Sequence, residues 1–121
     1  MELTRNSFKM GTLEMLVLSL LNHKDLYGYE ISLLLKDLSR GSYSVPEGSL
    51  YPVLYKLEDN KFITAHTVKA GKRRVRKVYH IEPDGKNRLE FLLSEYRSTA
   101  NGIELILGAE FSEYKEGEQW T

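Results

Sequence analysis

A run of basic residues offers the clearest chemistry in the sequence. Between Asn60 and Ile81 there is no aspartate or glutamate, yet seven of the chain's 17 lysines and arginines fall there. These are Lys61, Lys69, Lys72, Arg73, Arg74, Arg76 and Lys77. Cations without counter-charge attract the phosphates of a nucleic acid, although a solvated basic turn is common in any protein. The five cations from Lys72 to Lys77 are therefore the first candidate site.

A second candidate surface precedes this run. Apolar residues recur there at the spacing of a helix that packs one face on a core, namely Leu50, Val53, Leu54 and Leu57. The opposite face carries Ser49, Tyr51, Pro52, Tyr55 and Lys56. Hydroxyls, aromatic rings and a lysine can contact phosphates and base edges. The hydroxyl of Tyr29 is a further candidate, as a hydrogen-bond donor to a phosphate. Considered alone, this helix face is more typical of an ordinary solvent-exposed surface that happens to carry two tyrosines. Only the basic run that follows it in the sequence favours a nucleic-acid-binding surface.

Signals for other chemistry are weak. His23, His66 and His80 are scattered over a turn and two expected strands, without metal-ligand spacing. Cysteine is absent, which excludes disulfides, thiol catalysis and cysteine-based metal sites. There is no Ser-His-Asp order, paired-carboxylate pocket or glycine-rich phosphate loop. We expect no enzyme, hence no catalytic residues, no metal and no cofactor.

Composition bounds the remaining possibilities. The 121 residues suffice for one domain, and the formal net charge of zero means that any attraction to nucleic acid must be local. The longest apolar run, Met15 to Leu21, is too short to span a bilayer. The first eight residues are polar and unlike a signal peptide. We expect a soluble, cytoplasmic protein.

Two helices are expected before the candidate surface. The first starts with Thr12 as N-cap, after a polar arm of residues 1–9, and its main stripe is Leu13, Leu16, Val17, Leu20 and Leu21. Met15 and Leu18 lie off that stripe, so this helix either lies between two layers of its own chain or contributes to a subunit contact. The second spans about 28–39, followed by Gly41, and buries Ile31, Leu34, Leu35 and Leu38.

The start of the third helix is ambiguous. Ser44-x-x-Glu47 matches a capping box, after a possible short extended piece at 42–45. Pro52 cannot donate to the carbonyl of Gly48, so the helix either begins near Gly48 or bends there. It should end around Asp59.

The periodicity then changes to that of strands. Residues 62–68 and 75–81 are rich in β-branched and aromatic side chains, and the turn between them contains Gly71, which predicts a β-hairpin. Alternation places Arg74 and Arg76 on one face and Arg73, Val75 and Lys77 on the other. We expect Val75 and Tyr79 to pack inward, which would direct part of the cationic set towards phosphates.

A long final helix should run from Pro83 to Gly108. It carries more apolar surface than the small body before it can cover, so it needs a partner, most economically its copy in a second subunit. The expected dimer interface is Met15, Leu18, Leu92, Tyr96, Ile103, Ile106 and Leu107. Residues 110–121 form an acidic tail without clear period.

Three helices followed by a basic hairpin are typical of a winged helix-turn-helix. We therefore expect an α+β, mostly α, fold: a winged helix-turn-helix at 10–81, a C-terminal dimerisation helix at 82–109 and the flanking arm and tail. Five stretches make this expectation more specific: Gly11 to Leu18, Leu26 to Ile31, Gly48 to Leu54, Arg76 to Tyr79 and Glu95 to Arg97. In these stretches the chain resembles the PadR family of transcriptional regulators.

The resemblance implies a homodimer of the short form that binds a palindromic operator on double-stranded DNA, usually as a repressor. Its third helix would enter the major groove, and its last helix would hold the dimer. Members often respond to small aromatic compounds bound between the subunits. Candidate effector-binding residues are Phe8, Met10, Met15, Phe91 and Tyr96, although these fit plain dimer packing better.

Three departures from the family pattern stand out. The wing is longer, Glu82 stands where threonine is usual, and Tyr96 replaces a frequent tryptophan. Two other functions stay open. One is a winged-helix protein-interaction module whose basic hairpin binds an acidic partner, and the other is a DNA binder without effector.

Overall fold

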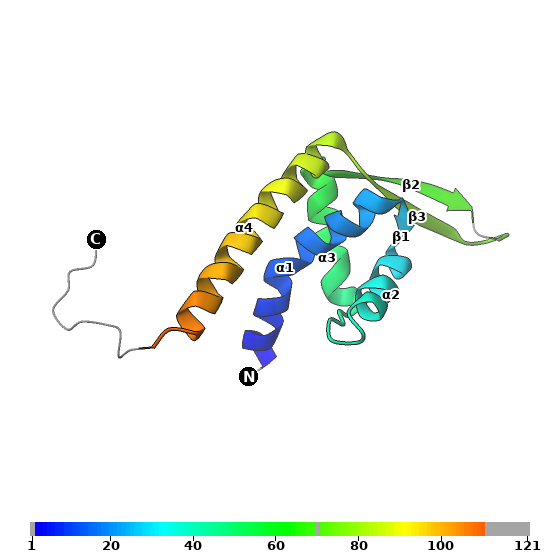
Figure 1. Ribbon diagram of the computed structural model, residues 1–121. Helices are drawn as coiled ribbons and strands as arrows, with labels where there is room; N and C mark the ends of the chain where they lie inside the picture. Colours follow the sequence, from blue (N-terminus) through cyan, green and yellow to red (C-terminus); the bar gives the residue numbers. More distant parts are fainter. Residues whose placement is uncertain (1, 70, 111–121) are drawn as a thin grey trace.

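Three helices, a two-stranded wing and a long last helix follow one another along the chain. The computed structural model describes residues 2–69 and 71–110, with side chains described from residue 11 onwards. The elements are α1 (Glu2–His23), β1 (Leu26–Tyr27), α2 (Gly28–Leu38), α3 (Glu47–Asp59), β2 (Ile63–Lys69), β3 (Val75–Ile81) and α4 (Pro83–Leu107). In Figure 1 the β2–β3 wing projects to one side of the helices, and α4 descends on the other. The fold is the expected α+β winged helix-turn-helix with a long C-terminal helix.

The sheet is antiparallel, with strand order β1-β3-β2. The hairpin pairs Ile63 with Ile81 at its base and Lys69 with Val75 at its far end, close to the predicted strands. The short β1 was not predicted. Its two residues pair with Tyr79 and Val78 of β3, and no local sequence pattern predicts this pairing.

One hydrophobic core joins α1, α2, α3 and the base of the sheet. Leu50, Leu54 and Leu57 of α3 are fully buried, as predicted, and Val53 is half-buried. Leu18 of α1 is also fully buried within its own chain. The prediction that Leu18 lies in a dimer interface is therefore wrong, because no part of its side chain reaches the surface. Leu38, expected in the core, is 69% exposed.

One helix start differs from expectation, and at another the start is near the predicted Gly48 but the expected Ser44–Glu47 capping box is absent. The first helix begins at Glu2, so Thr12 is not an N-cap; its Oγ1 lies 2.8 Å from the hydroxyl oxygen of Tyr43. The third begins at Glu47 with Pro46 as N-cap, and no side chain caps it. Pro52 is tolerated inside α3, where the carbonyl of Gly48 loses its usual donor. Residues 42–45 form no strand.

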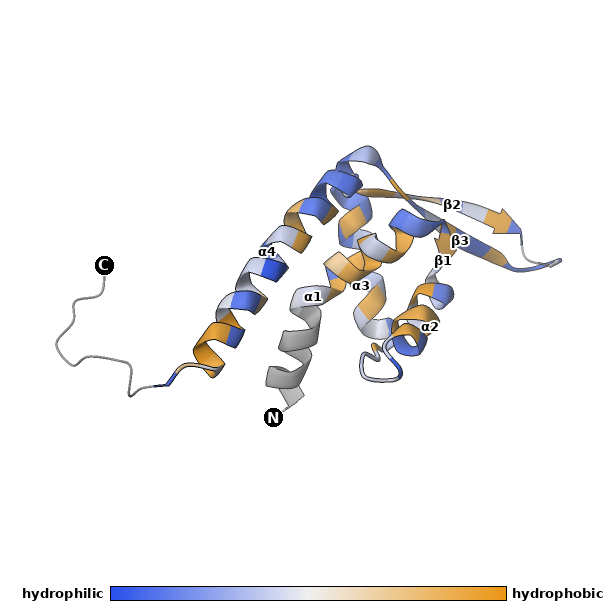
Figure 2. Cartoon of the chain, in the orientation of Figure 1, coloured by the Kyte–Doolittle hydropathy of each residue, from blue (hydrophilic) through white to orange (hydrophobic). Residues whose placement is uncertain are grey.

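The last helix, α4, spans the predicted range and packs on α1 through its first half. Leu89 is buried there, and the guanidinium of Arg88 donates two hydrogen bonds to Oε1 of Glu14, at 2.8 and 3.2 Å. Towards the C-terminal end, apolar side chains remain exposed, and Figure 2 shows this end coloured as hydrophobic. Those residues are Ile103, Leu105, Ile106 and Leu107. Within the described residues, no helix is long and apolar enough to cross a membrane.

Candidate nucleic-acid interface

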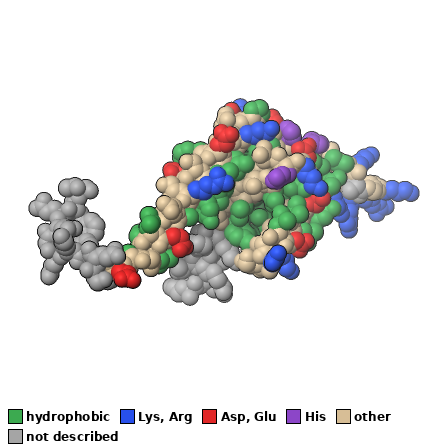
Figure 3. Space-filling model, in the orientation of Figure 1, with side chains coloured by type: hydrophobic (Ala, Val, Ile, Leu, Met, Phe, Trp, Pro, Cys, Tyr) green, Lys and Arg blue, Asp and Glu red, His purple; other side chains and the backbone are tan. Residues whose placement is uncertain are grey.

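The turn of the wing presents free positive charge. Lys72, Arg73 and Arg74 follow β2 in the turn and are all exposed. Within the described part of the chain, none of the three forms an ion pair. Figure 3 shows lysine and arginine side chains gathered around this far end of the hairpin. We call these three residues the wing tip.

The other two predicted cations, Arg76 and Lys77, lie on the stem of the wing and contact the body of the domain. The guanidinium carbon of Arg76 lies 4.9 Å from the ring centroid of Tyr29. The ammonium of Lys77 lies 3.9 Å from Oε1 of Glu58 and 5.7 Å from the ring centroid of Tyr55. The predicted phosphate contacts therefore divide into a free tip and an engaged stem.

The inward face of the wing was only half predicted. Tyr79 is 1% exposed and packs into the core, as expected. Val75, two positions earlier on the same face, is 64% exposed, so its inward packing was wrongly predicted. Val75 pairs with Lys69 at the far end of the hairpin, whereas Tyr79 lies nearer the base, where the core covers it.

The candidate face of α3 is largely available to a partner. Pro52 and Lys56 are exposed, Tyr55 is 52% exposed, and Ser49 is half-buried. Tyr51 differs, because its hydroxyl packs against the Cα of Gly28 at the start of α2. Burial raises the pKa of Tyr51, with smaller contributions from Glu47 and Tyr55.

A cleft of about 340 Å³ lies between α2, α3 and β3. Its lining contains most of the predicted stem and helix residues, together with residues that were not predicted, among them Tyr27 and Tyr79. The lining residues are Tyr27, Gly28, Tyr29, Tyr51, Tyr55, Val75, Arg76, Lys77 and Tyr79. The rings of Tyr27 and Tyr29 stack with centroids 5.7 Å apart. Donor hydroxyls, flat rings and cations together suit the backbone and base edges of a nucleic acid.

Sequence reasoning missed Tyr27, Tyr79 and Glu58 as members of this surface. Burial and the negative charge of Glu58 raise the pKa of Tyr79 to about 12. The available signal for Tyr79 was its place two residues after Lys77, because alternate strand residues share a face. Glu58 gave no signal, since its partner is distant in sequence.

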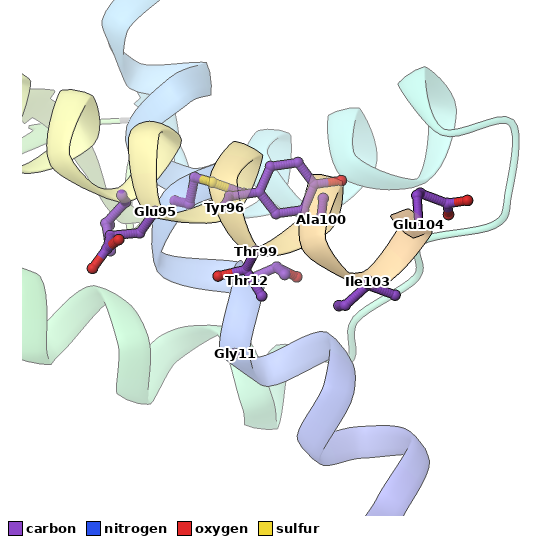
Figure 4. Close-up of a pocket in the computed structure, with 10 residues that line it drawn as sticks. Gly11, Thr12, Glu95, Tyr96, Thr99, Ala100, Ile103 and Glu104 are labelled. Atoms are coloured by element: carbon purple, nitrogen blue, oxygen red, sulfur yellow. The ribbon is translucent and has the colours of Figure 1, made fainter. Parts of the chain in front are cut away.

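A second cavity, of about 450 Å³, lies between α1 and α4. Met15 and Tyr96, both predicted for an effector site and the dimer interface, line it together with Gly11, Thr12, Leu92, Glu95, Thr99, Ala100, Ile103 and Glu104. Figure 4 shows Glu95 and Glu104 at opposite ends of this lining, with Tyr96 between them.

The remaining effector candidates lie elsewhere. Phe91 is not part of the lining; its ring centroid lies 5.6 Å from the guanidinium carbon of Arg88. The side chains of Phe8 and Met10 lie outside those described, although both positions belong to α1. Of the predicted dimer contacts, Ile106 and Leu107 are exposed beyond the cavity.

The histidines are surface residues, as expected. Nδ1 of His80 lies 2.7 Å from Oδ1 of Asp25, and its Nε2 lies 3.7 Å from Glu82. His23 and His66 are exposed. No cluster of three or more potential metal ligands occurs in the described residues.

Comparison with known proteins gives a consistent family. The profile described as "Transcriptional regulator PadR-like family" matches residues 17–91. "Uncharacterized protein X" of Lysinibacillus sphaericus is 31% identical over 105 residues, which cover 87% of this chain and 96% of that protein. The "Negative transcriptional regulator PadR" of Bacillus subtilis (strain 168) is 31% identical over 104 residues, covering 84% of this chain but only 57% of the relative.

Solved structures agree. A PadR family transcriptional regulator from Eggerthella lenta DSM 2243 superimposes with a TM-score of 0.78 and 25% identity, covering 90% of this chain and 93% of that one. Bacillus subtilis PadR in complex with operator DNA gives a TM-score of 0.64 and 33% identity, over 68% of this chain and 46% of that one. With the profile matching more than half of its residues, the chain belongs to the PadR-like family of transcriptional regulators.

Proposed function

We propose that this protein is a homodimeric, sequence-selective DNA-binding regulator that represses transcription from a palindromic operator. The observation that carries the proposal is the free charge of the wing tip beside the exposed face of α3. Lys72, Arg73 and Arg74 are exposed and without ion pairs among the described residues. A related protein, Bacillus subtilis PadR, has been solved in complex with operator DNA.

The two surfaces would have different roles. The exposed face of α3, with Pro52, Tyr55 and Lys56, would enter the major groove and meet base edges and thymine methyl groups. The wing tip would bind backbone phosphates, which contribute affinity and salt dependence but little choice of sequence. Sequence selectivity is therefore assigned to α3 and affinity to the tip.

A second subunit is proposed from the apolar end of α4. Ile103, Ile106 and Leu107 are large, apolar and exposed in the single chain. A copy of α4 packed on them by two-fold symmetry would remove this surface from water. To bind both halves of a palindrome, this dimer would have to place its two α3 helices about one turn of DNA, ~34 Å, apart.

The cavity between α1 and α4 supports regulation by a small aromatic effector. Its lining is mostly apolar and includes the ring of Tyr96 (Figure 4). A ligand there would alter the spacing of α1 and α4, and hence that of the two DNA-binding faces, if it prefers one dimer arrangement. The carboxylates of Glu95 and Glu104, with no lysine or arginine among the described residues of the lining, favour a neutral or cationic compound over an anionic one.

The test is binding to the palindromic DNA upstream of the protein's own gene and to random DNA, at several salt concentrations. The Arg73→Ala/Arg74→Ala variant should bind the palindrome more weakly, with a flatter salt slope. The matched control is Lys24→Ala/Lys86→Ala, which removes the same charge from exposed positions outside the wing. Equal, weak binding of the wild type to both DNAs would overturn the proposal and favour an acidic protein as partner of the wing.

A further inference from the structure

The side chain of Lys77 is about half exposed, yet its ammonium contacts the third helix. Strand alternation puts it on the same face of β3 as the buried Tyr79. Its ammonium meets Glu58 at 3.9 Å and lies 5.7 Å from the ring centroid of Tyr55. Tyr55 and Glu58 are three residues apart on α3, so they share one helix face. One side chain thus links the wing to two residues of α3.

Lys77 is the ion-pair partner of a carboxylate oxygen that has no hydrogen bond. Oε1 of Glu58 is buried and has no hydrogen-bond partner among the described residues, although the side chain as a whole is 27% exposed. The hydroxyl of Tyr79 is likewise buried and without a hydrogen bond in the described structure. Lys77 is the one cation that forms an ion pair with Glu58 in the described part of the chain. If Lys77 moved away to a phosphate, it would leave a partly buried carboxylate without counter-charge, which is unfavourable.

We propose that Glu58 and Lys77 are positioning residues that fix the angle between α3 and the wing, and that Lys77 does not bind a DNA phosphate. This inference rests on the proposed DNA-binding function and deepens it. A winged helix must place α3 and the wing tip on one DNA duplex at the same time. The ion pair joins these two elements directly, close to the tip, so its loss would change where the tip lies relative to α3.

The basic run therefore has two roles. The wing tip supplies phosphate contacts, whereas Lys77 on the stem sets where the tip lies. Glu58 has the same role from the side of α3, so a carboxylate close to the DNA-facing surface contributes to operator selectivity. Removal of either partner should have the same effect, and removal of both should add little, because the two act as a unit.

The experiment compares Lys77→Met, Glu58→Gln and the double variant with Lys72→Met, a matched loss of one lysine at the wing tip. Affinity for the operator and for random DNA is measured over a range of salt. Lys72→Met should lower the salt slope by about 1 and leave the ratio of operator to random affinity unchanged. Lys77→Met and Glu58→Gln should each keep the slope but lower that ratio by about fivefold, and the double variant no further.

Other outcomes overturn the inference. If Lys77 binds a phosphate, Lys77→Met will lower the slope as Lys72→Met does, and Glu58→Gln will strengthen binding to both DNAs. Lys77→Arg retains the ion pair and should therefore retain the ratio of operator to random-DNA affinity. A lower ratio for Lys77→Arg would contradict the positioning role. Circular dichroism confirms that each variant is folded. A wild type that does not prefer the operator would refute the proposed function itself, before any variant is considered.

Discussion

The hydroxyl of Tyr51 lies where the side chain of any other residue at position 28 would begin. A Cβ built on Gly28 would be 2.7 Å from that oxygen and 3.1 Å from the ring carbon Cζ. The Tyr27-Gly28-Tyr29 segment and the Ser49-to-Pro52 segment, separate in the sequence, therefore meet at one contact. It sets how closely α2 approaches α3.

This contact predicts a specific pattern of stability. Gly28→Ala should lower the free energy of unfolding by about 1–3 kcal/mol, because the new methyl group overpacks the junction. Tyr51→Phe removes the nearest atom, so the Gly28→Ala/Tyr51→Phe variant should recover part of that loss. Urea denaturation of the four proteins measures the coupling. Strictly additive effects would show that Tyr51 moves aside freely.

Gly85, in the first turn of α4, makes a tighter approach. A Cβ there would collide with the backbone carbonyl oxygen of Phe62 and come within 2.9 Å of Cγ1 of Ile81. Backbone cannot swing away as a side chain can, so Gly85→Ala should destabilise by roughly 2–4 kcal/mol. The control is Gly102→Ala in the same helix, where a Cβ would meet no described atom within 4 Å apart from its own helix backbone and chain neighbours.

The control should have the opposite sign. Alanine has a higher helix propensity than glycine, so Gly102→Ala is expected to stabilise by up to about 1 kcal/mol. Thermal unfolding of both variants at one protein concentration gives the comparison. Similar melting temperatures for the two would mean that α4 moves away from the end of α3 without cost.

Elements with a strong local period were predictable. The wing and α4 have nearly the predicted bounds, because β-branched alternation and an apolar helical stripe are properties of consecutive residues. The strand β1 was not predictable, because its two residues form a strand only through their pairing with β3, which is distant in the sequence. Leu18 shows the same limit: being apolar off the main stripe fits both a core and a subunit contact, and packing decides.

The candidate site was likewise predictable only in part. The sequence shows the type of each residue from Lys72 to Lys77, but it does not show which other residues each one contacts in the fold. Lys72 and Lys77 have the same side chain, yet one is exposed on the turn and the other meets Glu58, 19 positions earlier in the sequence. That distance explains why a count of cations overstated the number free to bind phosphate.

Tyr79 predicts a pH dependence of stability. Burial and Glu58 raise its pKa from 10.0 to about 12, so the folded state retains a proton that the unfolded chain loses. The resulting stabilisation is fully present below pH 10 and is lost as the pH rises towards about 12. This rise in the pKa corresponds to a stabilisation of at most ~3 kcal/mol.

The matched variant is Tyr79→Phe. Because the hydroxyl has no hydrogen-bond partner among the described residues, its removal should change stability at pH 7 by no more than about 1 kcal/mol. Lysine deprotonation affects both proteins alike, so the difference between their unfolding free energies isolates Tyr79. That difference should shift in favour of Tyr79→Phe between pH 10 and about 12. Parallel curves would contradict the raised pKa.

The proposed dimer places Ile103 at the contact between subunits. Ile103 is 46% exposed and lines the cavity between α1 and α4. Ile103→Asp would put a charge into an apolar interface, which should weaken the dimer by at least about 30-fold, corresponding to ~2 kcal/mol. Leu38→Asp is the matched control, because Leu38 is equally apolar and more exposed but lies on α2. Sedimentation equilibrium should give a dimer for the wild type and for Leu38→Asp, and a monomer for Ile103→Asp at low protein concentration. If only Leu38→Asp dissociates the dimer, the contact between subunits lies on α2.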